Sequence, residues 1–326
     1  MNRPRPIAEA LAAGLEFILQ HQHPDGSWSD WSLPPGPSDA WTTAYIGCHL
    51  SELPRPWRDH STLAGRAAAR WLVEHESYGG GWGYNASVGP DADSTAHALL
   101  CLSGAGIGVS RAARARLLEH QQVDGGFSTY TADAGLGSWG SSHPDVTAVA
   151  ARALLGSARA PVARAAGYLQ RARREDGTWH SFWWSSPLYA TAAALSLLRI
   201  VGDRGDTTRT YETISRMSVA NAFERALLLR CRVLAGLPTG NRGRATALID
   251  DLVSAQRSDG SWASTRMLRL TNRDCASPAP GADAGPLYAD PERLFTTATV
   301  LGALGVVQAA GVALHAGSDE MFRKSV

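Results

Sequence analysis

The stretch Gln22-His23-Pro24-Asp25-Gly26-Ser27-Trp28 decides the fold, because variants of it recur along the whole chain. The copies read Gly80-Gly81-Trp82, Gln122-Val123-Asp124-Gly125-Gly126-Phe127, Glu175-Asp176-Gly177-Thr178-Trp179 and Gln256-Arg257-Ser258-Asp259-Gly260-Ser261-Trp262. Asp-Gly favours a tight turn, and its glycine accepts the positive φ that follows a helix. Each copy therefore predicts a helix end and a turn, with an aromatic side chain that packs behind the turn.

A helix is expected on either side of each turn. The stretches before the turns, at 10–20, 65–74, 111–121, 162–172 and 245–255, are amphipathic. The stretches after the turns are rich in small and apolar residues and begin near Thr43, Thr95, Thr147, Thr191 and Thr297. A helix that is apolar on all sides is buried, whereas one with a charged face borders solvent. We therefore expect the first helix of each pair outside and the second inside.

The spacing of these threonines sets the number of repeats. The intervals are 52, 52, 44 and 106 residues, so the last interval spans two repeats. A less regular repeat at 218–235, without the Asp-Gly-aromatic turn before it, fills this last interval. Six helix pairs at a period of about 54 residues are typical of a closed ring of repeats. The sequence predicts an all-α (α/α)6 toroid over residues 1–314, followed by a polar tail at 315–326.

The long loops of this toroid are expected on one rim. They are the segments at 28–42, 82–94, 127–146 and 262–295, and each runs from an outer to an inner helix. The mouth of any central cavity is therefore expected on that rim.

The charge balance narrows the class of partner. The chain has 31 basic and 30 acidic residues, for a net charge of +1. A protein whose main partner is nucleic acid usually carries a clear basic excess, so that class is excluded. No apolar run approaches the ~18 residues that span a bilayer, and the N-terminus lacks the apolar core of a signal peptide. We expect a cytoplasmic protein.

The repeats resemble the QW repeats of squalene–hopene cyclases, class II diterpene cyclases and the β-subunits of protein prenyltransferases. A sharper resemblance lies in Asp91-Ala92-Asp93-Ser94-Thr95-Ala96, which is similar to the Asp-x-Asp-Asp-Thr-Ala motif of class II terpene cyclases. The resemblance implies that Asp93 is the general acid that protonates an alkene or epoxide and that Asp91 orients it. The segment around Asp145 resembles the next inner helix of the cyclases, where an Asp supports the acid.

The chain departs from the cyclase pattern in three places. Ser94 stands where many cyclases have a third carboxylate, and Val149 stands where squalene cyclases have a supporting His. Those cyclases also have a second barrel inserted between the first two repeats, for which this chain has no room. A lone toroid would close its cavity with its own loops, by forming a homodimer, or with a partner subunit.

The residues themselves allow two interpretations of the acids. A carboxyl group in an apolar cavity beside a second carboxyl keeps its proton, as an acid for alkene protonation must. Alternatively, Asp91 and Asp93 are N-caps of a helix. His97 follows Asp93 by four residues, so it either hydrogen-bonds toward the acid or is an ordinary core histidine.

Candidate substrate-binding residues come from the rim loops and the starts of the inner helices. Aromatic faces stabilise carbocations, which suggests cavity-lining roles for Trp82, Tyr84, Trp139, Trp183 and Trp184, with His143 beside them. Trp82 also belongs to the repeat phrase, where a structural wedge is the simpler interpretation. Arg266, Arg269, Arg273 and Arg293 could hold an anionic head group, or pair with acidic residues of the same loop.

No metal or tightly bound cofactor is expected. The place where prenyltransferases carry a zinc-binding Asp-x-Cys reads Asp145-Val146-Thr147, and the Asp-Asp-x-x-Asp motif of class I terpene synthases is absent. Mg²⁺ enters only if the substrate is a diphosphate.

These observations predict a class II-type terpene cyclase. It would start the cyclisation or isomerisation of a polyisoprenoid, such as a prenyl diphosphate, by protonation from Asp93. Two alternatives remain: an acid-catalysed cyclase of a non-terpene natural product, and a non-catalytic toroid that acts as a binding subunit. The expected partner is an apolar isoprenoid-like molecule, with transient membrane contact during its uptake.

Overall fold

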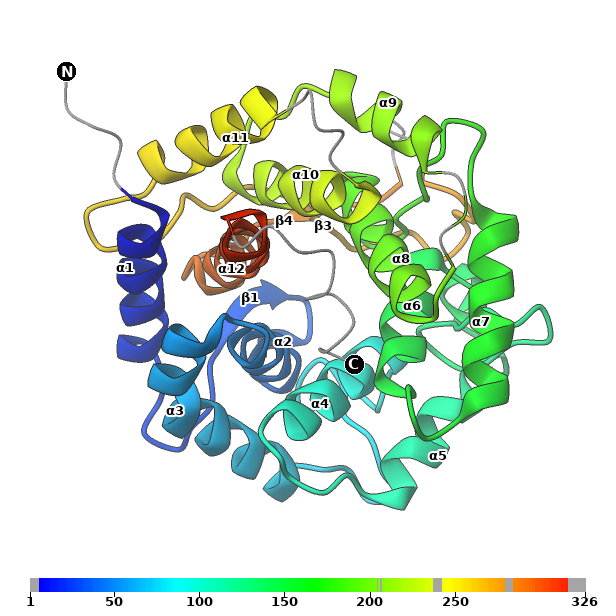
Figure 1. Cartoon of the computed structure of the whole chain (residues 1–326). Coiled ribbons are helices and arrows are strands. Elements are labelled where there is room, and N and C mark those ends of the chain that lie inside the picture. The colour runs from blue at the N-terminus through cyan, green and yellow to red at the C-terminus, as the bar shows by residue number, and fades with distance from the viewer. Residues whose placement is uncertain (1–5, 204, 206, 237–241, 279–283, 316–326) are drawn as a thin grey trace.

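The computed structural model describes residues 6–203, 205, 207–236, 242–278 and 284–315, and its helices form two concentric rings (Figure 1). The outer ring consists of α1 (Ile7–Gln20), α3 (Arg55–Glu74), α5 (Arg111–Glu119), α7 (Arg159–Ala172), α9 (Thr208–Arg216) and α11 (Arg242–Ser254). The inner ring consists of α2 (Ala40–Ser51), α4 (Ala92–Gly104), α6 (Pro144–Ala153), α8 (Leu188–Ile200), α10 (Ala222–Ala235) and α12 (Leu294–His315). The predicted toroid of six helix pairs is confirmed. Helix α12 includes His315, and the rest of the predicted tail, 316–326, lies outside the described residues.

The aromatic residue of each repeat turn joins the two rings. The backbone N–H of Trp28 donates to Oγ1 of Thr43 at 2.8 Å, and its indole Nε1 donates to the carbonyl of Ile18 at 2.9 Å. The same two bonds recur at the other tryptophans of the repeat, Trp82, Trp179 and Trp262. The recurring threonine therefore fixes the start of the inner helix, and the tryptophan fixes the end of the outer one.

The glycine of each turn lets the turn contact the next outer helix. Gly26 has a φ of +97°, and a Cβ there would lie 2.8 Å from the backbone of Ala67 in α3. Gln22 donates to the carbonyls of Gly26 and Ala64, which fastens the turn to α3. The corresponding bond from Gln256 to the carbonyl of Ala10 joins the last repeat to the first and closes the ring.

A buried pair of carboxyl groups strengthens this closure. Asp30 accepts hydrogen bonds from four backbone N–H groups, those of Trp31, Glu292, Leu294 and Phe295. Neighbouring Asp290 accepts from Ser264 and from the backbone of Thr296. Asp30 therefore joins the first rim loop to the start of the last inner helix.

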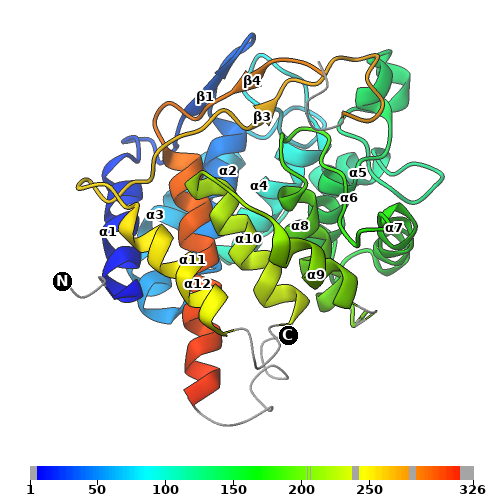
Figure 2. The same ribbon diagram turned by 90° about the horizontal axis from the view of Figure 1, so that it is seen from above.

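The long loops lie on one rim, as predicted, and carry two small antiparallel hairpins that the all-α expectation did not include (Figure 2). One hairpin pairs β1 (Asp30–Leu33) with β2 (Gly36–Ser38), and the other pairs β3 (Leu268–Arg269) with β4 (Leu287–Tyr288). The short 3₁₀ turns η1 (Ala132–Ala134) and η2 (Gly137–Gly140) lie in the loop of the third repeat. The hairpins are confined to the rim, so the core remains helical.

The longest loop crosses the rim and covers part of the mouth. The N–H of Arg269 donates to the carbonyl of Trp183 at 2.6 Å, which places the loop over the fourth repeat. Further on, the carbonyl of Arg273 accepts from the N–H of Ser138, and the carbonyl of Thr271 accepts from the indole of Trp139. The loop of the sixth repeat thus reaches the third repeat, and the chain's own loops form the walls of the cavity.

Candidate active site

The second residue of every inner helix contributes to one layer near the long-loop rim. In chain order these residues are Trp41, Asp93, Asp145, Tyr189, Phe223 and Phe295. The first four line a common cavity, whereas Phe223 and Phe295 pack against Trp184 at ring distances of 5.2 and 5.4 Å. Two carboxyl groups therefore lie in a layer that is otherwise aromatic.

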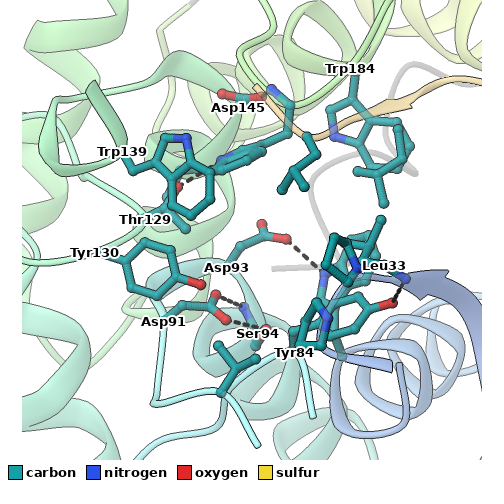
Figure 3. Close-up of a pocket in the computed structure, with 18 of the residues that line it drawn as sticks. Leu33, Tyr84, Asp91, Asp93, Ser94, Thr129, Tyr130, Trp139, Asp145 and Trp184 are labelled. Atoms are coloured by element: carbon teal, nitrogen blue, oxygen red, sulfur yellow. Dashed lines mark hydrogen bonds between the residues drawn. The ribbon is translucent and has the colours of Figure 1, made fainter. Parts of the chain in front are cut away.

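The cavity has a volume of about 400 Å³ and opens on the long-loop rim. Figure 3 shows aromatic side chains on facing sides of it, with the Asp93 carboxyl directed into the space between them. Besides the inner helices, the tip of the β1–β2 hairpin and the loop around Leu268 and Leu270 line it. An apolar, concave site with a few polar groups is the usual form of a small-molecule site.

Asp93 has the surroundings of a general acid. Its Oδ2 accepts a 2.7 Å hydrogen bond from the indole Nε1 of Trp41, and 19% of its side chain remains exposed within the mouth. Burial raises the pKa of Asp93 to about 7, against the opposing effect of the Trp41 bond. The protonated form of the carboxyl group is therefore well populated at neutral pH, unlike that of an ordinary Asp, and Oδ1 is the oxygen available to carry the proton.

Asp91 is the N-cap of α4. Its two oxygens accept from the backbone N–H of Ser94 at 2.8 Å and from the Ser94 hydroxyl at 2.7 Å. Burial raises the pKa of Asp91 to about 7, and the nearby Asp93 adds to the shift. The N-cap interpretation holds for Asp91, although it also lines the cavity. Ser94, which replaces the third carboxylate of the cyclase motif, is the hydrogen-bond partner of this cap.

Asp145 positions the aromatic segment on the opposite wall. Its Oδ2 accepts from the backbone N–H groups of Phe182 and Trp183, at 2.9 and 3.2 Å. Its Oδ1 is buried and has no hydrogen-bond partner among the described residues. Burial raises the pKa of Asp145 to about 6, with a smaller contribution from Asp93. Asp145 therefore holds Trp183 in the wall and is, after Asp93 and Asp91, a third carboxyl group with a raised pKa in the cavity.

The two candidate histidines lie outside the cavity. The Nδ1 of His97 is 2.9 Å from the Asp93 carbonyl, and since a carbonyl only accepts, Nδ1 carries the hydrogen. The Nε2 of His143 donates to the carbonyl of Ser138, and its ring stacks on Phe182 at 3.6 Å. His143 precedes Pro144 and faces back into its own rim loop, so it supports that loop and does not contact the cavity.

Most of the aromatic residues selected from the sequence line the cavity. Tyr84, Trp139, Trp183 and Trp184 do so. Trp82 does not, because it is the fully buried wedge of its repeat.

Sequence reasoning missed Trp41 and Tyr130 as cavity residues. Trp41 precedes Thr43 by two positions, as Asp93 precedes Thr95, so comparison of the repeats could have placed it beside the acid. Tyr130 lies in an irregular loop and carries no such signal.

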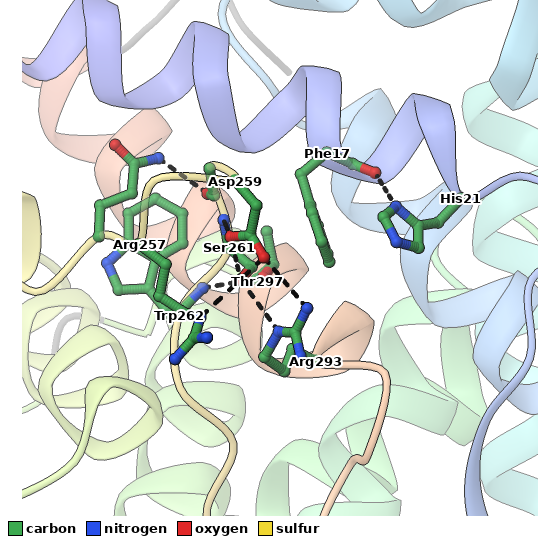
Figure 4. A network of polar contacts seen from close by, with 10 residues as sticks. Phe17, His21, Arg257, Asp259, Ser261, Trp262, Arg293 and Thr297 are labelled. Carbon is green, nitrogen blue, oxygen red and sulfur yellow. Dashed lines mark hydrogen bonds and ion pairs between the residues drawn. The ribbon is translucent and has the colours of Figure 1, made fainter.

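Of the four arginines proposed from the sequence, Arg266, Arg269 and Arg293 are not at the cavity. The guanidinium of Arg293 donates to Asp259 and Ser261 in the last repeat turn and lies over Phe17 at 5.5 Å (Figure 4). Arg266 is exposed, and Arg269 is buried in β3 away from the lining.

Arg273 lines the cavity instead, with its guanidinium 4.9 Å from the Trp139 ring centre. Within the described residues it is the one cationic side chain of the lining.

The described residues do not include a cluster of three or more His, Cys, Asp or Glu side chains that could hold a metal ion. Nor does any helix among them have both the length and the apolar character needed to cross a bilayer.

The comparisons with known proteins agree with this geometry. No family model matches the chain. The chain is 32% identical over 232 residues to a drimenyl diphosphate synthase of Streptomyces showdoensis. That match covers 69% of this chain and 39% of the synthase, so the chain spans about two fifths of its relative's length.

Solved structures resemble the chain over nearly its full length. The type II terpene cyclase MstE from Scytonema is 27% identical, with a TM-score of 0.82 over 94% of this chain and 98% of MstE. A protein from Actinoplanes is 30% identical, with a TM-score of 0.84 over 93% of this chain and all of that protein. A variant of MstE has been solved in complex with its substrate, geranylgeranyl dihydroxybenzoate.

Proposed function

Since the chain belongs to the class II terpene cyclase family, we propose that it cyclises or isomerises a polyisoprenoid by protonating a carbon–carbon double bond. The observation that carries the proposal is the Asp93 carboxyl group, whose pKa burial raises to about 7, in a cavity walled by aromatic rings.

The reaction begins with the proton of Asp93. A terminal double bond that reaches Oδ1 takes this proton, which leaves a tertiary carbocation on the substrate and a carboxylate on Asp93. The Trp41 indole N–H then donates to a charged acceptor, so this hydrogen bond becomes stronger as the proton leaves. A bond that strengthens during proton transfer lowers the barrier to that transfer.

The aromatic wall supports the cation that follows. Trp41, Trp183, Trp184 and Tyr189 present ring systems to a cavity with few polar groups. Ring faces attract a cation most strongly where water is excluded. Successive attack by the remaining double bonds forms rings, and loss of a proton or capture of water ends the sequence.

The head group of the substrate is proposed to be anionic and to contact Arg273. This guanidinium lies over Trp139 at the exposed edge of an otherwise largely apolar wall, where an anionic group can pair with it. Two head groups fit this chemistry: a diphosphate, which the name of the Streptomyces relative suggests, and a carboxylate, which the MstE substrate suggests. A diphosphate would remain on the product.

Magnesium is not assigned to the protein itself. The described residues do not form a metal cluster, so any Mg²⁺ would come with a diphosphate substrate, and no step is derived through it. We further propose a cytoplasmic enzyme that contacts membranes transiently to take up its substrate. The chain's own loops wall the cavity and cover part of its mouth, and a homodimer or a partner subunit remains our proposal for covering the rest.

One assay tests the function. Wild type and Asp93→Asn are incubated separately with farnesyl diphosphate, geranylgeranyl diphosphate and a prenylated dihydroxybenzoate, with and without Mg²⁺. Extracts are analysed by mass spectrometry before and after phosphatase treatment. A cyclic product from wild type and none from Asp93→Asn supports the proposal, whereas equal turnover by both contradicts it. No product from any isoprenoid would favour a non-terpene substrate or a binding subunit.

A further inference from the structure

A second, smaller cavity lies below the substrate cavity, further from the long-loop rim. Its volume is about 60 Å³. Each inner helix contributes to its lining one turn after that helix's residue in the layer of Asp93. The six residues concerned are Tyr45, His97, Val149, Ala193, Leu227 and Thr299. This space is the lower cavity, and it continues the substrate cavity along the axis of the barrel.

The lower cavity exists because α8 presents small side chains to the barrel axis. Ala192, Ala193 and Ser196 of this helix line it. On either side of α8, Val149 from α6 and Leu227 from α10 complete this part of the wall (Figure 1). The space under the start of α8 is therefore bordered mainly by small and apolar groups, which suit a hydrocarbon chain.

Tyr189 separates the two cavities. Of the described residues it is the one that lines both. It is the second residue of α8, level with Asp93, and its ring stacks on Trp184 and Phe223 at centroid distances of 4.3 and 6.4 Å. The side chain is 6% exposed, so the ring cannot turn aside without displacing these neighbours. Tyr189 therefore forms a fixed floor of the substrate cavity at the level of the acid.

The level of this floor decides how far an isoprenoid chain can enter. In the proposed reaction the head group stays near Arg273 at the mouth, so the hydrocarbon chain enters tail first. A chain whose end rests on Tyr189 has its terminal double bond in the layer of Asp93. If the floor were one isoprene unit lower, an internal double bond would lie beside the same carboxyl group.

From this geometry, and resting on the function proposed above, we infer that Tyr189 stops the isoprenoid chain so that its terminal double bond, rather than an internal one, receives the proton of Asp93. The π electrons of that double bond form the new C–H bond, and the electron pair of the broken O–H bond stays on the Asp93 carboxylate. The proton adds to the CH carbon, because this leaves the positive charge on the tertiary carbon.

The double bond that is protonated determines the carbon skeleton of the product. After protonation at the chain end, the next double bond toward the head group attacks the cation, so the last isoprene unit becomes part of a ring. Protonation of an internal double bond would instead leave the tail as an open side chain. Tyr189 is therefore a specificity-determining residue, and its effect can be read from the structure of the product.

Deuterium labelling tests this inference. Wild type and Tyr189→Ala are incubated in deuterium oxide with geranylgeranyl diphosphate and, separately, with geranylgeranyl dihydroxybenzoate, and NMR locates the deuterium in each product. In the wild-type product the deuterium should lie on the carbon that was the terminal CH. Tyr189→Ala joins the two cavities, so the fraction labelled at an internal CH, with an open side chain, should rise at least about tenfold. Wild-type labelling by Tyr189→Ala would overturn the inference.

Three further variants separate the ring of Tyr189 from its surroundings. Tyr189→Phe keeps the ring and should place the deuterium as wild type does. Leu227→Ala is the matched control, because Leu227 lines only the lower cavity and its loss enlarges that space without opening the floor. Tyr189→Ala combined with Ala193→Leu refills the space and should move the label back toward the chain end. An internal label in Tyr189→Phe would assign the effect to the hydroxyl group and contradict the inference.

Crystal structures test the floor without turnover. In Asp93→Asn bound to geranylgeranyl dihydroxybenzoate or geranylgeranyl diphosphate, the end of the chain should lie above Tyr189. In Asp93→Asn combined with Tyr189→Ala, it should enter the lower cavity. The same chain-end position in both variants overturns the inference and leaves the cyclase function standing. Equal turnover by wild type and Asp93→Asn contradicts the cyclase function instead, and thermal melting verifies that each variant is folded.

Discussion

The indole of Trp41, from the first repeat, donates a 2.7 Å hydrogen bond to Oδ2 of Asp93 in the second repeat. The two residues occupy the same position in neighbouring inner helices, so the repeat itself brings them together. The bond favours the ionised carboxyl group, whereas burial favours the protonated one. The result is a carboxyl group that keeps its proton at rest and has a stabilising partner once the proton is gone.

Asp93→Asn should abolish cyclisation, with a loss of at least about 10³-fold in kcat, because an amide cannot supply the proton.

The Asp93→Asn variant should be more stable than wild type above pH 7. In the folded wild type the pKa of Asp93 is raised above its ordinary value, so stability falls as the pH rises between that value and about 7. Thermal melts at pH 5 and pH 8 measure this, with Asp133→Asn on the exposed rim as the control. A variant that melts below wild type at pH 8 would contradict the assignment.

Trp41→Phe should change the pH profile as well as the rate. Activity needs protonated Asp93, so kcat/KM of wild type should be constant at low pH and fall above about pH 7. Removal of the indole N–H raises the pKa of Asp93, which shifts this fall to higher pH and makes the acid weaker. We expect the low-pH plateau of kcat/KM to be roughly 10–100-fold lower than in wild type. The reason is that the lost hydrogen bond to the ionised carboxyl group contributes about 1.5–3 kcal/mol. A lower plateau with an unmoved pH profile would show that only packing was lost.

Arg273→Gln should weaken the binding of anionic substrates. We expect KM to rise by about tenfold or more with little change in kcat, because the head group lies away from the reacting double bond. The corresponding prenyl alcohol should show no such change. Arg266→Gln, at an exposed position of the same loop, is the control. Equal effects on the charged and uncharged substrates would exclude a head-group role.

Gly260→Ala should destabilise the ring closure. Gly260 has a φ of +89°, and a Cβ there would collide with the backbone of Ala13 in α1. Gly202 has a similar φ of +83° but open space around it. Gly202→Ala should therefore lower the free energy of unfolding only by the backbone strain, about 1–2 kcal/mol. Gly260→Ala should lower it by at least about 2 kcal/mol more, because the methyl group also collides with α1. Urea unfolding of both variants measures the difference, and equal losses would mean that α1 moves freely to accommodate the methyl group.

Asp30→Asn should destabilise the protein more than Asp290→Asn. Asp30 accepts four backbone N–H groups, which favours its ionised form, and an amide would direct N–H groups at some of these donors. Burial raises the pKa of both carboxyl groups, so the pair holds a proton. Asp290 accepts from only one backbone N–H and one hydroxyl among the described residues, so we expect the proton on Asp290, where an amide is tolerated better. We expect a difference of about 1–3 kcal/mol in the free energy of unfolding. The reverse order would assign the proton to Asp30.

The fold was predictable because it rests on local, repeated signals. The Asp-Gly turns specify positive φ, the tryptophans behind them find the same threonine and carbonyl partners in each repeat, and six such units close by the same contacts that join neighbours. The position of Asp93 was predictable for a similar reason: it lies two residues before one of these threonines, at the start of an inner helix. Its role as the acid stays a prediction.

Other parts of the site depend on contacts between residues far apart in the sequence. Arg273 reaches the cavity because its loop crosses the rim to Ser138, whereas Arg293 is held at a repeat turn by Asp259. Nothing in the loop sequence distinguishes these two arginines. Likewise, His143 and Trp82 carry plausible residue types but face away from the cavity.

The sequence alone therefore determined the toroid, the rim that carries the mouth, and the place of Asp93 at the start of the second inner helix, because short-range periodicity fixes backbone turns and helix faces. Only the tertiary structure decided that Trp41 contacts Asp93, that Asp91 is a cap, and which arginine lines the cavity. Those features depend on contacts at the centre of the ring between irregular loops and inner-helix side chains that belong to different repeats. These contacts join residues far apart in the sequence, so no local pattern predicts them.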